Sequence, residues 1–184
     1  MPLPGGVAGE AELVDVVLTE RMTLSEIRAR LEGNLPAGDT LVDLFDVWLG
    51  EPTMAARLGA ADYRLEVGGA TSAELAEACA RLLAATSLPR GRPKGDGRVV
   101  EYDLRPLLLR LDVSAGPASD EGSATTTAVT LWMRLQLAQD AASGRPDEVV
   151  QALGDAVARP LTVLRAVRER LLMIDDLAAT HGRG

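Results

Sequence analysis

Six basic residues gather in one short stretch of a chain whose formal net charge is −8. They lie between Pro89 and Val113, and they are Arg90, Arg92, Lys94, Arg98, Arg105 and Arg110. Glycines interrupt the first half of this stretch, and glycine lets a backbone approach a ligand closely. Arginine forks match the geometry of phosphate. The stretch therefore predicts a projecting, anion-binding hairpin, although a solvated loop that balances nearby acids would have the same composition.

Asp103 is the one candidate for an acid–base or nucleophilic carboxylate. Arg105 and the neighbouring cations could keep this side chain ionised. On an alternating strand, however, Asp103 and Arg105 would share a face, so a structural ion pair explains both residues. We favour the structural explanation and keep Asp103 as the only catalytic candidate.

Other catalytic residues and cofactor ligands are scarce. The only histidine, His181, lies near the end of the chain, so a serine-type triad lacks its base. The only cysteine, Cys79, lies on the apolar face of an expected helix, where a lone cysteine is usually core filler. One cysteine cannot hold an iron–sulfur cluster, and no Cys/His spacing suits zinc. We therefore expect no metal and no cofactor, and a binding role rather than a catalytic one.

A second surface is expected on the run from Val129 to Leu137, which alternates between apolar and polar residues. Side chains along a strand point alternately to opposite faces, so Trp132 and Arg134 fall together on the polar face. This pair indicates a partner surface, or a helix that covers the strand.

Two capping boxes predict where helices begin. In each, a threonine and a glutamate three residues later can satisfy free backbone N–H groups, as in Thr23–Glu26 and Thr71–Glu74. The two threonines are 48 positions apart, and each box follows a β-prone run. Two copies of one supersecondary unit would explain this order.

These elements predict an α+β fold. Strands are expected at residues 12–18, 41–49, 62–67, 129–137 and 160–174, the last although its residue types favour a helix. We predict two ferredoxin-like β-α-β units packed side by side, with helices on one face of an antiparallel sheet and the first unit incomplete. The expected parts are 1–60 for the first half, 61–175 for the second half with the basic hairpin, and 176–184 for a flexible tail.

Charge and composition narrow the class of protein. An acidic chain is poorly suited to long duplex DNA, where many phosphates must be neutralised, but a local basic patch can bind RNA or another anionic partner. A single cysteine permits no intrachain disulfide, which is typical of the cytoplasm. The amino terminus does not resemble a signal peptide, and no apolar run approaches the roughly 20 residues of a membrane span. We therefore expect a soluble cytoplasmic protein.

Five short motifs resemble a known family. They are residues 11–18 (AELVDVVL), 34–36 (NLP), 61–65 (ADYRL), 100–106 (VEYDLRP) and 144–149 (GRPDEV). In this order they resemble the radical SAM-linked, or radical SAM-associated, protein family, a bacterial domain of unknown function. Its members occur alone or fused behind a radical SAM protein. The resemblance implies a radical SAM protein as partner.

The chain departs from that family at its amino terminus. Family members carry a further strand-helix-strand segment with a Ser-His-Leu-Asp-type motif, and this chain begins after it. The strand expected at 12–18 would then have an unpaired edge, which invites pairing with another chain. We expect a homodimer, or a fused or separate partner, at that strand.

Three functions remain open. The first is a non-catalytic accessory or substrate-recognition domain of a radical SAM protein, whose hairpin holds an anionic partner such as RNA. The second is a free-standing RNA-binding or ribosome-associated module. The third is a cofactor-independent RNA-modifying enzyme that uses Asp103. The residues expected to bind the partner are Arg90, Arg92, Lys94, Arg98, Arg105, Trp132 and Arg134.

Overall fold

The two runs that alternate most clearly in the sequence become neighbouring strands of one sheet. The structure is a computed structural model that describes residues 3–93, 95, 97–114, 128–137 and 143–181, the last four by backbone alone. In it, β2 (Leu58–Gly68) pairs antiparallel with β6 (Val129–Gln136), and Tyr63 lies opposite Met133. Alternation places Tyr63, Leu65 and Val67 of β2 in the core, as expected for a strand with one solvated face.

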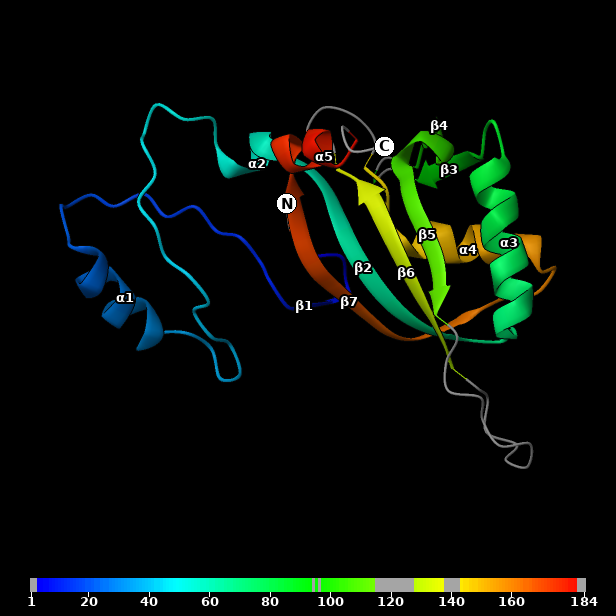
Figure 1. The fold of residues 1–184 in the computed structure, drawn as a ribbon, viewed down its shortest axis with the longest axis horizontal. Helices are drawn as coiled ribbons and strands as arrows, with labels where there is room; N and C mark the ends of the chain where they lie inside the picture. Colours follow the sequence, from blue (N-terminus) through cyan, green and yellow to red (C-terminus); the bar gives the residue numbers. More distant parts are fainter. Residues whose placement is uncertain (1–2, 94, 96, 115–127, 138–142, 182–184) are drawn as a thin grey trace.

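The sheet has five strands in the order β1-β7-β2-β6-β5 (Figure 1). The edge strands are β1 (Ala8–Gly9) and β5 (Leu108–Ser114), and β7 (Thr162–Met173) lies between β1 and β2. β1 runs parallel to β7, whereas the other pairs are antiparallel. The fold is therefore α+β with a mixed sheet, and the expectation of a purely antiparallel sheet is wrong because the chain enters alongside β7.

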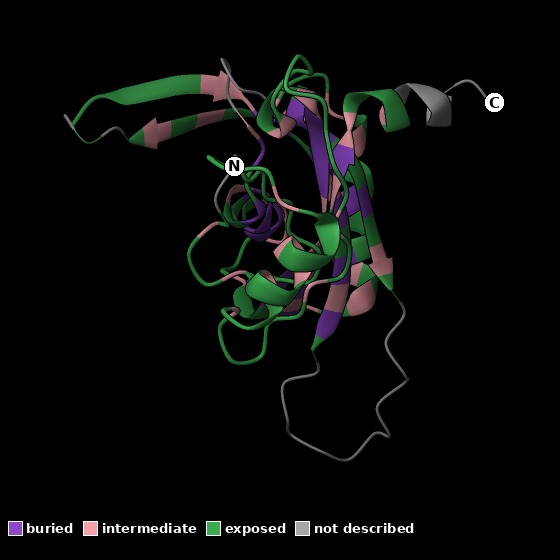
Figure 2. Cartoon of the chain, turned by 90° about the vertical axis from the view of Figure 1, so that its left-hand side faces the viewer, coloured by how far each residue is buried: buried purple, intermediate pink, exposed green. Residues whose placement is uncertain are grey.

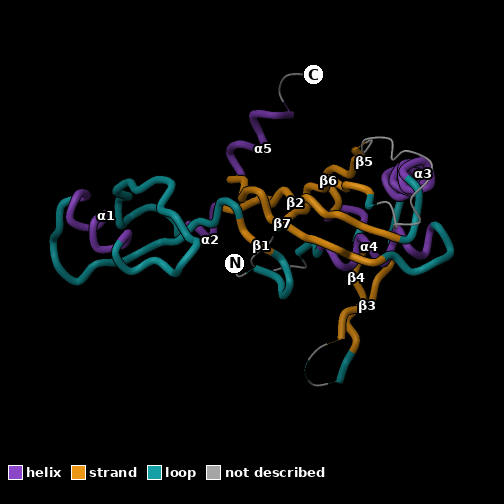
Figure 3. The backbone as a smooth tube through the Cα atoms, turned by 90° about the horizontal axis from the view of Figure 1, so that it is seen from below, coloured by secondary structure: helices purple, strands orange, loops and turns teal. Residues whose placement is uncertain are grey.

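Two helices pack against one face of this sheet. α3 (Ser72–Ala84) begins at the predicted capping box and buries Leu75, Ala78, Cys79 and Leu82. α4 (Pro146–Ala156) shares the same apolar cluster with α3 and the strands, and Figure 3 shows α4 on one side of the sheet and α5 (Ile174–His181) on the other. Gly154 lies inside α4, where a Cβ would lie 3.1 Å from the Arg159 carbonyl oxygen.

The basic stretch forms the hairpin that was predicted. β3 (Pro89–Pro93) and β4 (Val99–Asp103) pair antiparallel in their own two-stranded sheet. The hairpin extends away from the main sheet and is largely exposed (Figure 2). A short 3-10 helix, η1 (Arg105–Leu107), then leads into β5.

The first of the two expected units is not formed. Residues 12–18 and 41–49 carry no regular secondary structure, although both were predicted as strands. α1 (Leu24–Glu32) does begin at its predicted capping box, and α2 (Met54–Arg57) is one short turn. A helix closes its hydrogen bonds locally, whereas a strand needs a neighbour, and neither run has one in the described residues. The ferredoxin-like arrangement of two units is therefore not confirmed.

The ambiguous run near the carboxyl end is a strand, as predicted. β7 pairs with β2 from Leu58 opposite Met173 to Gly68 opposite Thr162. Part of the tail expected beyond residue 176 belongs to α5. None of the helices in the described ranges has both the length and the apolar character needed to span a bilayer.

Candidate functional site

Arg92 is bound to α4 rather than free at the hairpin surface. Its Nε and Nη2 atoms donate to the two carboxylate oxygens of Glu148 at 2.8 and 2.7 Å, and Nη2 also donates to the Ser143 carbonyl at 3.0 Å. The guanidinium lies 4.7 Å from the centre of the Tyr102 ring. Burial, with the Glu148 carboxylate beside it, raises the pKa of Tyr102 to about 12. Arg92 therefore holds the hairpin against α4.

The other basic residues of the basic stretch differ in their surroundings. Arg90 Nη2 lies 3.1 Å from the Asp155 carboxylate at the far end of α4. Arg98 is exposed just before β4. Lys94 lies outside the described residues. The acids of α4 thus face two of the arginines that sequence reasoning assigned to an anionic partner.

Arg105 and Asp103 stabilise the turn of the chain that follows the hairpin. Arg105 donates from Nε and Nη2 to the Leu83 carbonyl at 3.1 and 2.8 Å, and from Nη1 to the Leu108 carbonyl at 3.0 Å. Asp103 Oδ1 accepts from the backbone N–H groups of Leu88 and Arg105 at 2.7 and 2.9 Å. These bonds hold the pKa of Asp103 below its ordinary value. The two residues do not share a strand face as expected, because Arg105 already belongs to η1.

Trp132 and Arg134 lie on the sheet face opposite to the core cluster, here called the open face. Trp132 is 37% exposed, and the Arg64 guanidinium carbon lies 5.6 Å from its ring centre. Residues paired across neighbouring strands share a face, which adds Arg110 and Asp112 of β5 and four residues of β2 and β7. The last four are Asp62, Glu66, Arg165 and Arg170.

The open face carries a network of ion pairs. Asp62 accepts two hydrogen bonds from Arg134, at 2.7 and 2.9 Å, and one from Arg170 at 2.7 Å. Partial burial raises the pKa of Asp62, but these hydrogen bonds outweigh it and hold the pKa below its usual value. Arg64 donates to Glu169 and Glu10 at 2.7 and 2.9 Å. Sequence alternation placed Asp62, Arg64 and Glu66 on one face, but Arg170 joins them only through the β2–β7 register.

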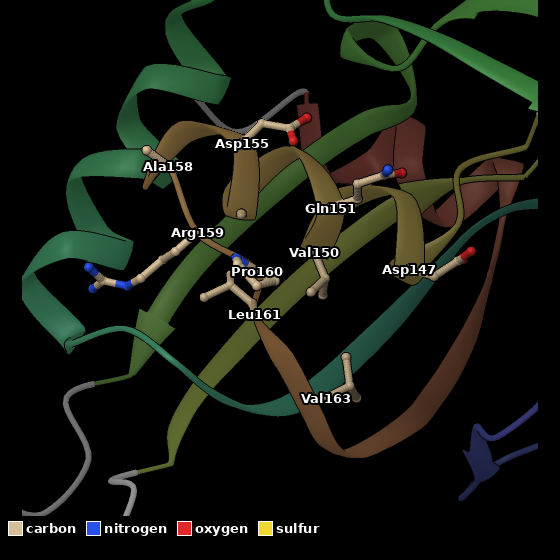
Figure 4. A pocket seen from close by; sticks show the side chains of 10 residues that line it. Asp147, Val150, Gln151, Asp155, Ala158, Arg159, Pro160, Leu161 and Val163 are labelled. Atoms are coloured by element: carbon tan, nitrogen blue, oxygen red, sulfur yellow. The ribbon is translucent and has the colours of Figure 1, made fainter.

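A groove of about 750 Å³ lies elsewhere, beside α4 and the turn that precedes β7 (Figure 4). Asp147, Gln151 and Asp155 line its helix side, and Pro160 and Leu161 line the turn. Arg159 points from this turn toward α3 in Figure 4, where it donates to the Gly69 carbonyl and pairs with Glu74. Among the residues that line the groove, Asp155 alone forms an ion pair with one of the predicted site residues that the structure describes, Arg90.

The described residues hold no group of three or more His, Cys, Asp or Glu side chains placed to bind a metal ion. Cys79 is buried, and burial raises the pKa of its thiol to about 11. The six predicted binding residues that the structure describes are thus distributed over the hairpin, the turn after it and the open face, and of these six Trp132 and Arg134 belong to the open face.

Residues 1–146 match a protein family described as "Uncharacterized protein conserved in bacteria (DUF2344)". The match includes the hairpin, Trp132 and Arg134, and it ends where α4 begins. Nothing in it refers to a radical SAM protein. Comparison with curated proteins and with solved structures found no match. Since the match covers most of the chain, the protein belongs to this uncharacterised family of proteins conserved in bacteria.

Proposed function

We propose that this protein is a non-catalytic recognition domain that binds single-stranded RNA on its open face, around Trp132. The layering of charge on that face carries the proposal. Arg110, Arg165 and Arg170 keep 68%, 60% and 58% of their side-chain surface exposed, whereas Asp62 and Glu66 keep 16% and 36%. An approaching ligand therefore meets these three guanidinium groups before it meets Asp62 or Glu66, whereas Asp112 keeps 48% of its side-chain surface exposed.

The residues of the open face suit the two chemical parts of a nucleotide. An exposed aromatic ring offers a surface on which a base can stack without sequence preference, and Trp132 is such a ring. Arginine guanidinium groups bind phosphate in fork geometry. Arg110 lies on β5, the strand next to that of Trp132, and Arg165 and Arg170 lie on β7, beyond β2. Ion pairs with Asp62 and Glu66 hold Arg170 and Arg165 on this face before a ligand arrives, and Asp112 holds Arg110.

The order of elements from β2 to β7 supports treating residues 58–173 as one ferredoxin-like unit, with the hairpin inserted before β5. Open faces of such sheets recur in RNA-handling proteins, but a fold alone does not assign a function. The proposal therefore rests on the residues of the open face. It keeps Arg98 and Lys94 as candidate contacts and assigns Arg90, Arg92 and Arg105 to holding the hairpin.

The test is the affinity of the full chain for a fluorescein-labelled, mixed-sequence single-stranded RNA of about a dozen nucleotides. Removing one stacking contact costs about 1–3 kcal/mol, so Trp132→Ala is expected to weaken binding several-fold or more, while Trp132→Phe retains most of it. Arg110→Gln is expected to weaken binding and to reduce the steepness of its salt dependence.

The control separates the open face from the hairpin. A variant with Arg90, Arg92 and Lys94 changed to Ser is expected to bind this RNA with less loss than Trp132→Ala. If the hairpin variant loses binding while Trp132→Ala and Arg110→Gln keep it, the hairpin is the binding site and the proposal is wrong. If none of the variants changes the affinity, the RNA does not bind at either place.

A second candidate, an accessory role beside a radical SAM protein in the cytoplasm, is favoured by the five sequence motifs. Its test is co-purification of an iron–sulfur protein with the tagged chain from cells. The remaining alternative is an RNA-modifying enzyme that uses Asp103. It predicts that Asp103→Asn abolishes turnover and leaves RNA binding intact. Against this alternative, one oxygen of the carboxylate already accepts hydrogen bonds from two backbone N–H groups.

A further inference from the structure

Residues 10–53, here called the arm, leave the sheet after β1 and return at α2 (Figure 1). The backbone N–H of Met54 donates to Asp15 Oδ2 at 2.8 Å and brings the two ends of the arm together. No residue of the arm is buried (Figure 2). Even α1, which has an amphipathic sequence and a complete capping box, contributes no buried side chain.

The arm exposes large apolar side chains from two separate runs. The most exposed are Val14, Val17, Val42, Phe45, Trp48 and Leu49. Soluble proteins rarely expose apolar side chains in such concentration unless they meet a partner, and tryptophan is enriched among the residues that carry binding energy at interfaces. Trp48, at 75% exposure, is the most exposed aromatic side chain of the arm.

The net charge of the arm nearly equals that of the whole protein. From residue 10 to 53 there are ten acidic residues and three arginines, a net charge of −7 within a chain of −8. Interfaces of stable complexes bring complementary potentials together. The arms of two copies would repel each other, and anionic membranes and nucleic acids would be repelled in the same way.

We propose that the arm is a docking surface for a basic protein, whose cationic side chains surround an apolar centre that covers Phe45 and Trp48. The apolar residues would supply most of the affinity, and the acidic residues would select the partner and accelerate its encounter. This surface is separate from the open face and would let the protein hold a protein and an anionic ligand at once.

The experiment uses the full chain and three synthetic peptides of equal length, with Leu and Lys, Ser and Lys, or Leu and Glu in alternation. The Leu/Lys peptide is expected to bind at least about tenfold more tightly than either of the others, because only it supplies both apolar and cationic groups. Changing Phe45 and Trp48 together to Ser is expected to reduce its affinity about tenfold or more. Trp132→Ala, which leaves the arm unchanged, is the matched control and is expected to bind normally.

Three results would overturn the proposal. Equal binding of the Leu/Lys and Ser/Lys peptides would mean that charge alone attracts them. Unchanged binding by the Phe45/Trp48 variant would place the peptide elsewhere. Sedimentation of the unmodified chain as a dimer that the same variant dissociates would identify a second copy as the occupant. Circular dichroism of the variant confirms its fold, and a chain without residues 16–53 provides an independent negative control.

Discussion

Ala158 is the one non-glycine residue with a positive φ in the described part of the chain, at 57°. It follows the end of α4, where the backbone N–H of Ala158 donates to the Asp155 carbonyl and that of Arg159 donates to the Gly154 carbonyl, at 3.2 and 3.0 Å. A left-handed residue at this position lets the chain turn back over the helix end. Glycine usually takes it, because a Cβ is unfavourable in this conformation.

We therefore expect Ala158→Gly to stabilise the protein by about 0.5–1 kcal/mol, which is the relief of left-handed strain less the entropy that glycine adds to the unfolded chain. Urea unfolding followed by circular dichroism measures the change. Ala76→Gly is the matched control, since Ala76 is an exposed position inside α3 and glycine there should destabilise by about 1 kcal/mol. A loss of stability in Ala158→Gly would mean that the Ala158 side chain makes contacts that offset its strain.

Single residues also have contacts that the sequence did not indicate. Arginines in a glycine-rich stretch have the composition of an anion site, but a guanidinium binds whatever acceptor the fold brings to it. α4 brings Glu148 to Arg92, and the end of α3 brings the Leu83 carbonyl to Arg105. The sequence separation of these pairs offers no periodic signal that could have revealed them.

At the scale of elements, α1 and α3 begin in the same way and end in different surroundings. In both, the glutamate accepts from the threonine backbone N–H at 2.8 Å, and the glutamate N–H donates to the threonine hydroxyl at 3.3 Å. α3 also buries four side chains, and its capping residue Glu74 pairs with Arg159, which follows the carboxyl end of α4. The capping signal is thus sufficient to start a helix but does not decide where the helix packs.

This contrast predicts that the stability of the protein depends on pH through the capping box of α3 and not through that of α1. Hydrogen bonds from Thr71 and Arg159 lower the pKa of Glu74 from 4.5 to about 2. Because the folded pKa is lower than the unfolded one, the stability that the carboxylate contributes is complete above 4.5 and is lost as pH falls toward 2. Glu74→Gln should therefore be less stable than the unchanged protein near neutral pH, and the difference should shrink over that range.

Thermal unfolding at several pH values measures this difference. Glu26→Gln is the matched control, since Glu26 occupies the same place in the box of α1 and its pKa is also lowered, chiefly by the Thr23 backbone. α1 contributes nothing to the core, so this substitution should leave the melting temperature nearly unchanged. A pH-independent loss in Glu74→Gln would show that the neutral amide, rather than the missing charge, causes the effect.

The whole molecule divides into a packed unit and an unpacked one. The core cluster draws on β2, β5, β6, β7, α3, α4 and the residues beside them, while the arm buries no residue. β1 and the first residues after it are the exception to this division. Glu12 pairs with Arg168, which is buried beside Tyr63, and Ala8 lies opposite Val167.

We expect that replacing residues 16–53 with a short Gly/Ser linker leaves the sheet folded. Asp15 and Met54 are already hydrogen-bonded, and shortening a surface loop changes the entropy of the unfolded chain only modestly. The melting temperature should stay within a few degrees of the original, with the same cooperativity. Loss of a cooperative transition would mean that the arm packs on the sheet in solution.

The same excision should leave RNA binding at the open face intact and abolish binding of the Leu/Lys peptide. A fall in both activities would indicate that the arm supports the open face, which the proposals of separate surfaces do not allow.

The Glu12→Gln variant extends this test to the part of the amino terminus that does contact the sheet. It removes the carboxylate charge that pairs with buried Arg168 and should be destabilising, since a buried charge that loses its counter-charge is costly.

The sequence by itself determined the elements whose interactions are local or strictly periodic. The capping boxes start α1 and α3, and alternation identifies β2 and β6 and assigns Trp132 and Arg134 to a polar face. Tertiary structure decided everything that depends on a distant neighbour. Residues 162–173 are a strand because β2 pairs with them along their length, whereas residues 12–18 and 41–49, equally β-prone, have no partner and no strand. The physical reason is that a helix satisfies its backbone hydrogen bonds within a few residues. A strand, like an arginine side chain, finds its hydrogen-bond partners far along the chain.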